Sequence, residues 1–222
     1  MQEIFFRISV LPAYGIGALV VILLFAIQSE VRFGARARTI RTGASDRNST
    51  LTLSLSQMVP LLGFALAMKA NSPAAVSMIP DWFRHAVLPG LPGLGWLGVV
   101  LGGCGLALRL WAVLTLRERF TRTLLVQEHQ SIERGGPYRW IRHPGYLGSL
   151  LCLNGVALAS GNLITLLASL AATSAAYGYR IRTEDEMLTA ALGPSYAEYR
   201  SQVRALLPSF RAPTAVDRSK RN

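Results

Sequence analysis

Residues 136–148 read GPYRWIRHPGYLG, and we expect the fold to be organised around this stretch. Its Gly-Pro-Tyr and His-Pro-Gly triplets each predict a turn, because proline fixes φ and glycine adopts conformations that other residues avoid. Two short apolar segments follow, at 146–160 and 162–179, and they predict a tight helical hairpin. Such a hairpin returns the chain to the end where it began. We therefore predict that the stretch meets the acid cluster formed by residues 184–186.

The composition predicts an integral membrane protein. Hydrophobic residues make up 51% of the 222 residues and charged residues only 16%, and the mean hydropathy is +0.33. A soluble domain needs more charge to cover its surface. The net charge of +11 does not indicate a nucleic-acid partner, because the arginines cluster at the ends of apolar blocks, as in cytosolic membrane loops. Cys104 and Cys152 both lie in apolar segments, so neither a disulfide framework nor a metal site is predicted.

The fold class that we predict is an all-α integral membrane protein with about five transmembrane helices. The expected spans are residues 10–28, 51–70, 93–114, 146–160 and 162–179. The loop at 29–50 holds five arginines and the segment at 115–145 holds six, whereas the loop at 71–92 holds one. A five-span topology places both arginine-rich segments on one side, and the positive-inside rule makes that side the cytosol. The N-terminus is then outside, and a C-terminal amphipathic helix, interrupted near Gly193-Pro194, is cytosolic.

Three regions follow from these expectations: a three-span membrane region at 1–114, a cofactor-binding region at 115–208 with its hairpin at 146–179, and a disordered basic tail at 209–222. Glycines at 93, 95 and 98 imitate a dinucleotide fingerprint, but no strand precedes them. Gly98 and Gly102 instead form a GxxxG step, which predicts close packing against another helix.

The stretch and the acid cluster each have a structural interpretation as well as a functional one. The arginines and aromatic rings of 136–148 would suit an interfacial collar that binds lipid phosphates. An ionised residue close to hydrocarbon usually marks a function or a partner, which favours a site at Glu184. Arg180 precedes Glu184 by four residues on the same helical face, so an internal ion pair is the simple alternative.

The sequence resembles the isoprenylcysteine carboxyl methyltransferase family, whose wider superfamily includes the phospholipid N-methyltransferases. The resemblance covers about residues 128–208: GPYRWIRHPGYLG, an apolar hairpin, then RIRTEDEML and LGPSYAEY. The family pattern has two glutamates after the hairpin. Glu184 matches the first; Asp185 stands at the second, where its shorter side chain also leaves Glu186 as a candidate.

The resemblance implies that S-adenosyl-L-methionine is the cofactor and that no metal is needed. The cofactor-binding residues that it implies are His129, Tyr138, His143, Pro144, Tyr146, Gly148, Glu184 and Asp185. Arg180 and Glu184 are the implied catalytic residues: Arg180 would orient an anionic substrate, and Glu184 would also bind the amino group of the cofactor.

The function that we predict is methyl transfer in a membrane, most similar to isoprenylcysteine carboxyl O-methylation, onto a lipidic or small-molecule acceptor. The compact N-terminal region and basic loops suit a bacterial inner membrane, with the site facing the cytosol. A phospholipid amine or a small thiol is an alternative acceptor; an amine would need a base such as Glu184, Glu186 or His129. The sequence also leaves open an NADPH-dependent sterol or isoprenoid reductase and a non-enzymatic transporter or scaffold.

Overall fold

A computed structural model describes residues 20–22, 24, 46–70, 78–88, 93–116 and 132–209 of the chain. The elements are α3 (Ser49–Ala70), α4 (Asp81–Arg84), α5 (Gly93–Leu116), the 3-10 helix η4 (Gly136–Arg139), α6 (Pro144–Ala159), α7 (Leu163–Leu192) and α8 (Pro194–Gln202). Over these residues the only extended pairing is an isolated bridge between Val87 and Asn162. The all-α prediction is confirmed for the described part of the chain.

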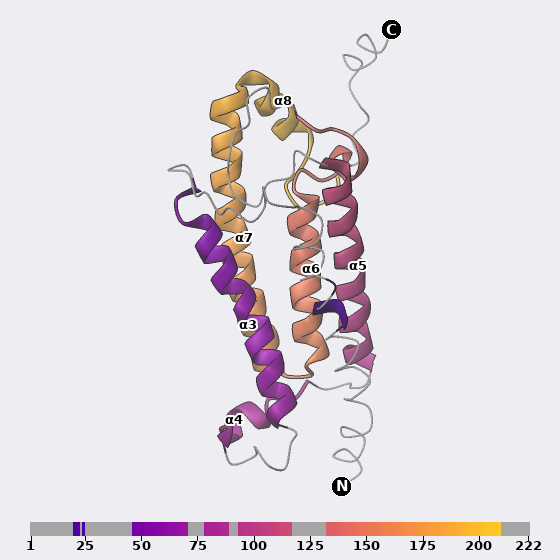
Figure 1. The fold of residues 1–222 in the computed structure, drawn as a ribbon, viewed down its shortest axis with the longest axis vertical. Helices are drawn as coiled ribbons and strands as arrows, with labels where there is room; N and C mark the ends of the chain where they lie inside the picture. Colours follow the sequence, from indigo (N-terminus) through magenta and orange to yellow (C-terminus); the bar gives the residue numbers. More distant parts are fainter. Residues whose placement is uncertain are drawn as a thin grey trace.

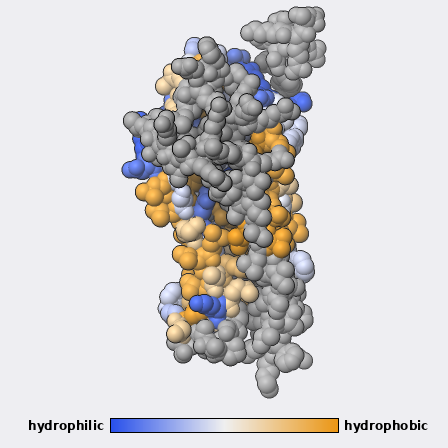
Figure 2. Space-filling model, in the orientation of Figure 1, coloured by the Kyte–Doolittle hydropathy of each residue, from blue (hydrophilic) through white to orange (hydrophobic). Residues whose placement is uncertain are grey.

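Two of these helices, α3 and α5, are long and apolar enough to cross a membrane, by length and composition. Only 22% of the apolar window of α3 and 28% of that of α5 is buried inside the protein, whereas the core helix of a soluble protein would be mostly buried. Figure 2 shows hydrophobic residues over the middle of the visible surface and hydrophilic residues toward its two ends. The expected spans at 51–70 and 93–114 agree with these helices within two residues. The expected span at 10–28 lies largely outside the described residues.

The long helices run side by side along one axis (Figure 1). Helix α5 packs against α6, and α3 packs against both α6 and α7. The turn at 160–162 joins α6 to α7, and Leu88 donates its backbone N–H to the carbonyl of Gly161 there. At the opposite end, Trp111 of α5 lies against Trp140, with 6.0 Å between ring centroids. The predicted hairpin is therefore present, and it returns the chain to the end where residues 136–143 lie.

Glycines bring α5 and α6 into backbone contact. A Cβ atom built on Gly98 would lie 2.6 Å from the carbonyl oxygen of Gly155, and one on Gly105 would lie 2.5 Å from that of Gly148. Because these positions are seven residues apart on each helix, they lie on one face. The expected packing role of Gly98 is confirmed. Close approach of this kind stabilises helix pairs in lipid, where burial of apolar side chains gives no net driving force.

Gly105→Val is expected to lower the free energy of unfolding by about 1–3 kcal/mol, or to prevent correct folding. The new Cβ would collide with the backbone nitrogen of Cys152, 2.5 Å away, and backbone atoms cannot move aside as a flexible side chain can. Gly103→Val is the matched control, because its Cβ position has no heavy atom within 4 Å. Thermal unfolding of both variants in detergent tests this; equal melting temperatures would contradict the packing role.

Polar side chains fasten α6 to α7 inside the bundle. Asn154 donates from Nδ2 to the Thr173 hydroxyl at 3.1 Å, and it accepts at Oδ1 from the Ser169 hydroxyl at 2.8 Å. Ser169 and Thr173 are fully buried. Hydrogen bonds between helices supply specificity where the surroundings are apolar. They fix the register of the hairpin and hence the position of the far half of α7.

Helix α7 differs from expectation in its length. The sequence predicts a span that ends at residue 179 and a separate amphipathic helix from 180, but α7 continues without interruption to Leu192. It ends at Gly193, whose φ of 58° is strained for other residues, and Pro194 then occupies the first turn of α8. The predicted break at Gly193-Pro194 is thus confirmed. The continuous helix therefore carries both the second arm of the hairpin and the acid cluster.

Candidate cofactor site

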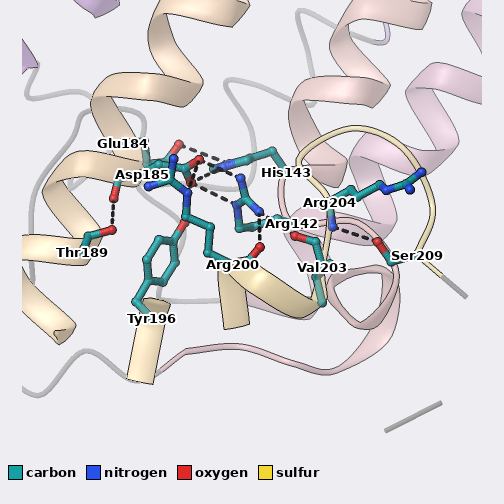
Figure 3. A network of polar contacts seen from close by, with 10 residues as sticks. All are labelled: Arg142, His143, Glu184, Asp185, Thr189, Tyr196, Arg200, Val203, Arg204 and Ser209. Atoms are coloured by element: carbon teal, nitrogen blue, oxygen red, sulfur yellow. Dashed lines mark hydrogen bonds and ion pairs between the residues drawn. The ribbon is translucent and has the colours of Figure 1, made fainter. Parts of the chain in front are cut away.

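The predicted meeting of the 136–148 stretch with the acid cluster is seen directly in the structure. His143 precedes the first residue of α6, and its ring faces two acids of α7 (Figure 3). Its Nε2 is 3.0 Å from Oδ1 of Asp185, and its Nδ1 is 3.5 Å from Oε2 of Glu184. One ring therefore joins two carboxylates that differ in their other partners.

Asp185 is fully engaged by protein groups. Arg142 donates to it twice, from Nε at 3.0 Å and from Nη2 at 2.7 Å, and the Tyr196 hydroxyl donates at 2.6 Å. Its side chain is 4% exposed. Burial alone would raise its pKa, but the hydrogen bonds from His143 and Arg142 outweigh burial, so the pKa of Asp185 lies well below the usual value. Asp185 is an ionised anchor at neutral pH.

The segment at 203–209 lies along residues 140–143 and closes this side of the site. The backbone N–H groups of Arg142 and His143 donate to the carbonyls of Arg204 and Ala205, both at 2.9 Å. Arg142 also donates from Nη1 to the carbonyl of Val203 at 2.5 Å. Unpaired backbone groups at such a turn could receive a ligand, but these two N–H groups bind the chain itself. We call residues 203–209 the strap.

Glu184 has a different environment from its neighbour. Its Oε2 atom is buried and has no hydrogen-bond partner among the described residues, although the side chain as a whole is 23% exposed. Tyr146 stacks on His143, with 5.4 Å between ring centroids and 10° between ring planes, and its hydroxyl lies within hydrogen-bonding reach of the Glu184 carboxylate. A buried carboxylate oxygen without a donor is costly, and such a group marks a site for a cation or a donor.

Tyr138 lies close to the same carboxylate. Burial raises the pKa of its hydroxyl well above the ordinary tyrosine value, and the charge of Glu184 raises it further. Its backbone carbonyl accepts the Tyr199 hydroxyl at 2.6 Å, which fixes η4 against α8. The Tyr138 hydroxyl therefore stays neutral and able to donate.

Arg180 lies deep in the protein, on the far side of Tyr146. Its Nη1 is 2.7 Å from Oδ1 of Asp46, and the two side chains are 2% and 1% exposed. Its Nε donates to the Tyr146 hydroxyl at 3.1 Å. Asp46, which precedes α3, is thus a salt-bridge partner of Arg180, and the charge of Glu184 also acts on the guanidinium.

The remaining predicted residues fall in several places. Pro144 is the buried first residue of α6, and Gly148 packs against α5, where its Cβ position is 2.6 Å from the carbonyl oxygen of Gly105. Glu186 is exposed and pairs with Arg47 at 2.9 Å. His129 lies outside the described residues. The structure brings together His143, Tyr146, Glu184 and Asp185; their contact with a cofactor remains a prediction.

Sequence reasoning missed three members of this arrangement: Asp46, Arg142 and Tyr196. Arg142 stands in the quoted motif, and Tyr196 in the LGPSYAEY segment, but the pattern alone assigns neither of them a role. Asp46 is the one acid between Arg32 and Arg47, and it stands three residues before Ser49. An acid just before a helix start is typical of helix capping, which was the available signal.

Residues 96–190 match the model of the isoprenylcysteine carboxyl methyltransferase (ICMT) family. The matched segment begins in α5 and ends in α7, so it contains the 136–148 stretch, the hairpin and the acid cluster. This match confirms the resemblance inferred from those motifs. It leaves Asp46 and the strap outside the matched residues.

Three relatives illustrate the extent of similarity. The cobalt-zinc-cadmium resistance protein CzcN of Cupriavidus metallidurans is 35% identical over 127 residues, which are 57% of this chain and 53% of that protein. The protein-S-isoprenylcysteine O-methyltransferase of Tribolium castaneum is 32% identical over 61% of this chain and 50% of its own length. Protein-S-isoprenylcysteine O-methyltransferase A of Arabidopsis thaliana is 26% identical over 70% of this chain and 79% of its own length. The chain therefore spans about half the length of the first two.

The fold is similar to a solved structure of the eukaryotic intramembrane Ras methyltransferase ICMT. The TM-score is 0.63 at 20% sequence identity, and the match covers 86% of this chain and 65% of that chain. At that identity the similarity concerns the fold. The coverage of this chain is wider than residues 96–190, so the similarity of fold extends beyond the family segment.

Proposed function

We propose that this chain, whose residues 96–190 match the isoprenylcysteine carboxyl methyltransferase family, is a membrane methyltransferase that uses S-adenosyl-L-methionine. The observation that carries the proposal is the buried Oε2 of Glu184, which accepts no hydrogen bond from the described residues and lies 3.5 Å from Nδ1 of His143, beside the stacked rings of His143 and Tyr146. The two neighbouring acids, Asp46 and Asp185, already bind arginines, so Glu184 offers the negative charge that a cationic ligand needs.

The residues present fit this cofactor. It carries a cationic amino group, a sulfonium and a flat adenine ring. The Glu184 carboxylate would bind the amino group by a charge-assisted hydrogen bond. The face of the Tyr146 and His143 pair would offer a flat surface for a ring, and the neutral Tyr138 hydroxyl would donate a hydrogen bond.

The chemical demands on the protein are mainly positional. When bound, the cofactor supplies a methyl group that is already activated on a sulfonium, so a carboxylate acceptor needs no general base. The protein then has to hold acceptor and donor in line at near-attack distance, which supplies several kcal/mol of the barrier reduction. A partly dehydrated site favours a transfer in which opposite charges cancel. The proposed site lies at the end of the helical bundle where α6 begins.

For the acceptor we propose an isoprenylcysteine-like carboxylate or another lipidic or small-molecule acceptor. The names of the relatives from Tribolium and Arabidopsis support the first of these. A lipid tail would reach the site from the bilayer, and the cofactor from the cytosol. The role of Arg180 in orienting the acceptor remains a prediction from the sequence.

The topology belongs to the proposal as well. We propose five spans, with the N-terminus outside, the site facing the cytosol and the protein in a bacterial inner membrane. The division into regions 1–114, 115–208 and 209–222 goes with it. The apolar helices α3 and α5 support two of the spans, and the arginine counts support the orientation.

Ligand-induced thermal stabilisation tests the proposed function. S-adenosylhomocysteine is expected to raise the melting temperature of the detergent-solubilised protein, because a ligand that binds only the folded state stabilises it by RT ln(1 + [L]/Kd). NADPH, the cofactor of the alternative reductase, serves as the matched control and is expected to produce no shift. Stabilisation by NADPH without any response to S-adenosylhomocysteine would overturn the proposal in favour of the reductase.

A further inference from the structure

Asp46 forms a polar cluster with Ser49 and Thr50, the first residues of α3, and we call these three residues the socket. Its Oδ1 accepts the hydroxyls of Ser49 at 3.1 Å and Thr50 at 2.7 Å, and its Oδ2 accepts the backbone N–H of Thr50 at 3.2 Å. Asp46 and Ser49 are 1% and 0% exposed. The turn between them holds Arg47 and Asn48 at φ of 44° and 61°, a region costly for residues other than glycine. The socket is thus a fixed feature of the fold.

Arg180 of α7 inserts into this socket. Its Nη1 lies 2.7 Å from Oδ1 of Asp46 and 2.7 Å from the Ser49 hydroxyl, and it is 2.9 Å from that of Thr50. An arginine stays charged even when it is buried, so removal of its carboxylate partner leaves a charge unpaired inside the protein. Asp46 therefore determines the position of a side chain 134 residues away.

The position of Arg180 in turn determines the direction of the Tyr146 hydroxyl. Arg180 donates from Nε to the Tyr146 oxygen at 3.1 Å, so that oxygen accepts on one side. The hydroxyl proton must then point to another acceptor, and the Glu184 carboxylate lies within reach. The same tyrosine ring stacks on His143. Tyr146 thus links the socket to the surface on which we place the cofactor.

We propose that Asp46 is a positioning residue of the cofactor site, acting through Arg180 on Tyr146 and Glu184. This inference rests on the proposed function. It assigns a role in the site to a residue outside the family segment at 96–190, in a part of the chain otherwise interpreted as spans and loops. Asp46 touches no reacting group; it fixes the position of Arg180 and, through Arg180, that of Tyr146.

The test compares binding of S-adenosylhomocysteine, by calorimetry in detergent, in the wild type and in Asp46→Asn. Asp46→Asn is expected to weaken binding about five- to tenfold, because Arg180 loses the anionic partner that holds its Nη1 and the Tyr146 hydroxyl loses its fixed direction. Arg47→Gln is the matched control on the same turn: it breaks only the exposed pair with Glu186 and is expected to leave binding unchanged. Equal affinity in Asp46→Asn and the wild type would overturn the inference, whereas no binding by the wild type would overturn the proposed function itself.

A double-mutant cycle separates positioning from a general loss of stability. If Asp46 acts through Tyr146, the double variant Asp46→Asn with Tyr146→Phe is expected to lose less binding free energy than the sum of the losses in the two single variants. Additive losses would show that Asp46 stabilises the fold independently of the pocket, and would overturn the inference. If Asp46→Asn does not fold, Ser49→Ala replaces it in the same cycle with the same two outcomes, since it removes the two hydrogen bonds of the Ser49 hydroxyl and leaves the charges paired.

Discussion

Glu184→Gln is expected to weaken binding of S-adenosylhomocysteine by about 10- to 100-fold, because it removes one charge-assisted hydrogen bond to the cofactor amino group. The apo protein is expected to melt at an unchanged or higher temperature. The buried Oε2 of Glu184 has no hydrogen-bond partner among the described residues, so the burial of that oxygen costs stability. Loss of affinity without loss of stability is the mark of a group kept for binding.

Glu198→Gln is the control for this substitution. It makes the same chemical change on the exposed surface of α8, where Glu198 contacts Gln202 within the same helix. Calorimetry is expected to show a lower affinity for Glu184→Gln than for Glu198→Gln. Thermal unfolding is expected to show no loss of stability in either variant. Wild-type affinity in Glu184→Gln would remove the main support for a cofactor site and favour the interfacial collar of arginines and aromatic rings.

The sequence was sufficient for the apolar helices, because bilayer thickness and composition together set their bounds. The expected 51–70 and 93–114 differ from α3 and α5 by at most two residues. The predicted end of α7 at residue 179 is wrong, because the helix continues to Leu192. The change to polar residues at 180 alters the surroundings of the helix but does not end it. A helix ends where its backbone is interrupted, and the interruption is Gly193-Pro194.

The motifs also predicted which segments meet, but they did not predict that Glu184 and Asp185 have different partners. Adjacent residues of a helix point about 100° apart, so Glu184 and Asp185 both contact His143 but differ in their other partners. Asp185 faces Arg142 and Tyr196, whereas Glu184 faces Tyr146. Pairs such as Arg180 with Asp46 join residues 134 positions apart, and no local pattern encodes them. The meeting of the two segments could be predicted from the sequence, whereas the ion pairs between them required the fold.

Asp185 makes stability depend on pH in a definite direction. Its pKa in the folded protein is held below the unfolded value, so the unfolded state binds the proton more readily. The stabilisation is therefore fully present above the ordinary aspartate pKa of about 4, and it declines as the pH falls below that value. Because Asp185 is bound to Arg142, acid should loosen the strap that Arg142 holds through Val203.

Asp185→Asn is accordingly expected to lower the free energy of unfolding by about 3–5 kcal/mol at neutral pH. Arg142 would remain buried with its charge unpaired, and His143 would lose the acceptor of its Nε2. The strap should then detach, so amide hydrogen exchange is expected to accelerate at residues 142 and 143, whose N–H groups bind its carbonyls. The part of the acid-dependent loss of stability that Asp185 contributes should also disappear, since asparagine does not titrate.

A double substitution distinguishes an unpaired charge from a loss of packing. Arg142→Met combined with Asp185→Leu removes both charges and keeps apolar volume, so it is expected to recover much of the stability that Asp185→Asn loses. Affinity for S-adenosylhomocysteine should not recover with it, because His143 still lacks the carboxylate that orients its ring toward Glu184. If the double variant were as unstable as Asp185→Asn, packing and not charge would be the source of the loss. Recovery of stability without affinity would show that Asp185 serves the fold through Arg142 and the site through His143.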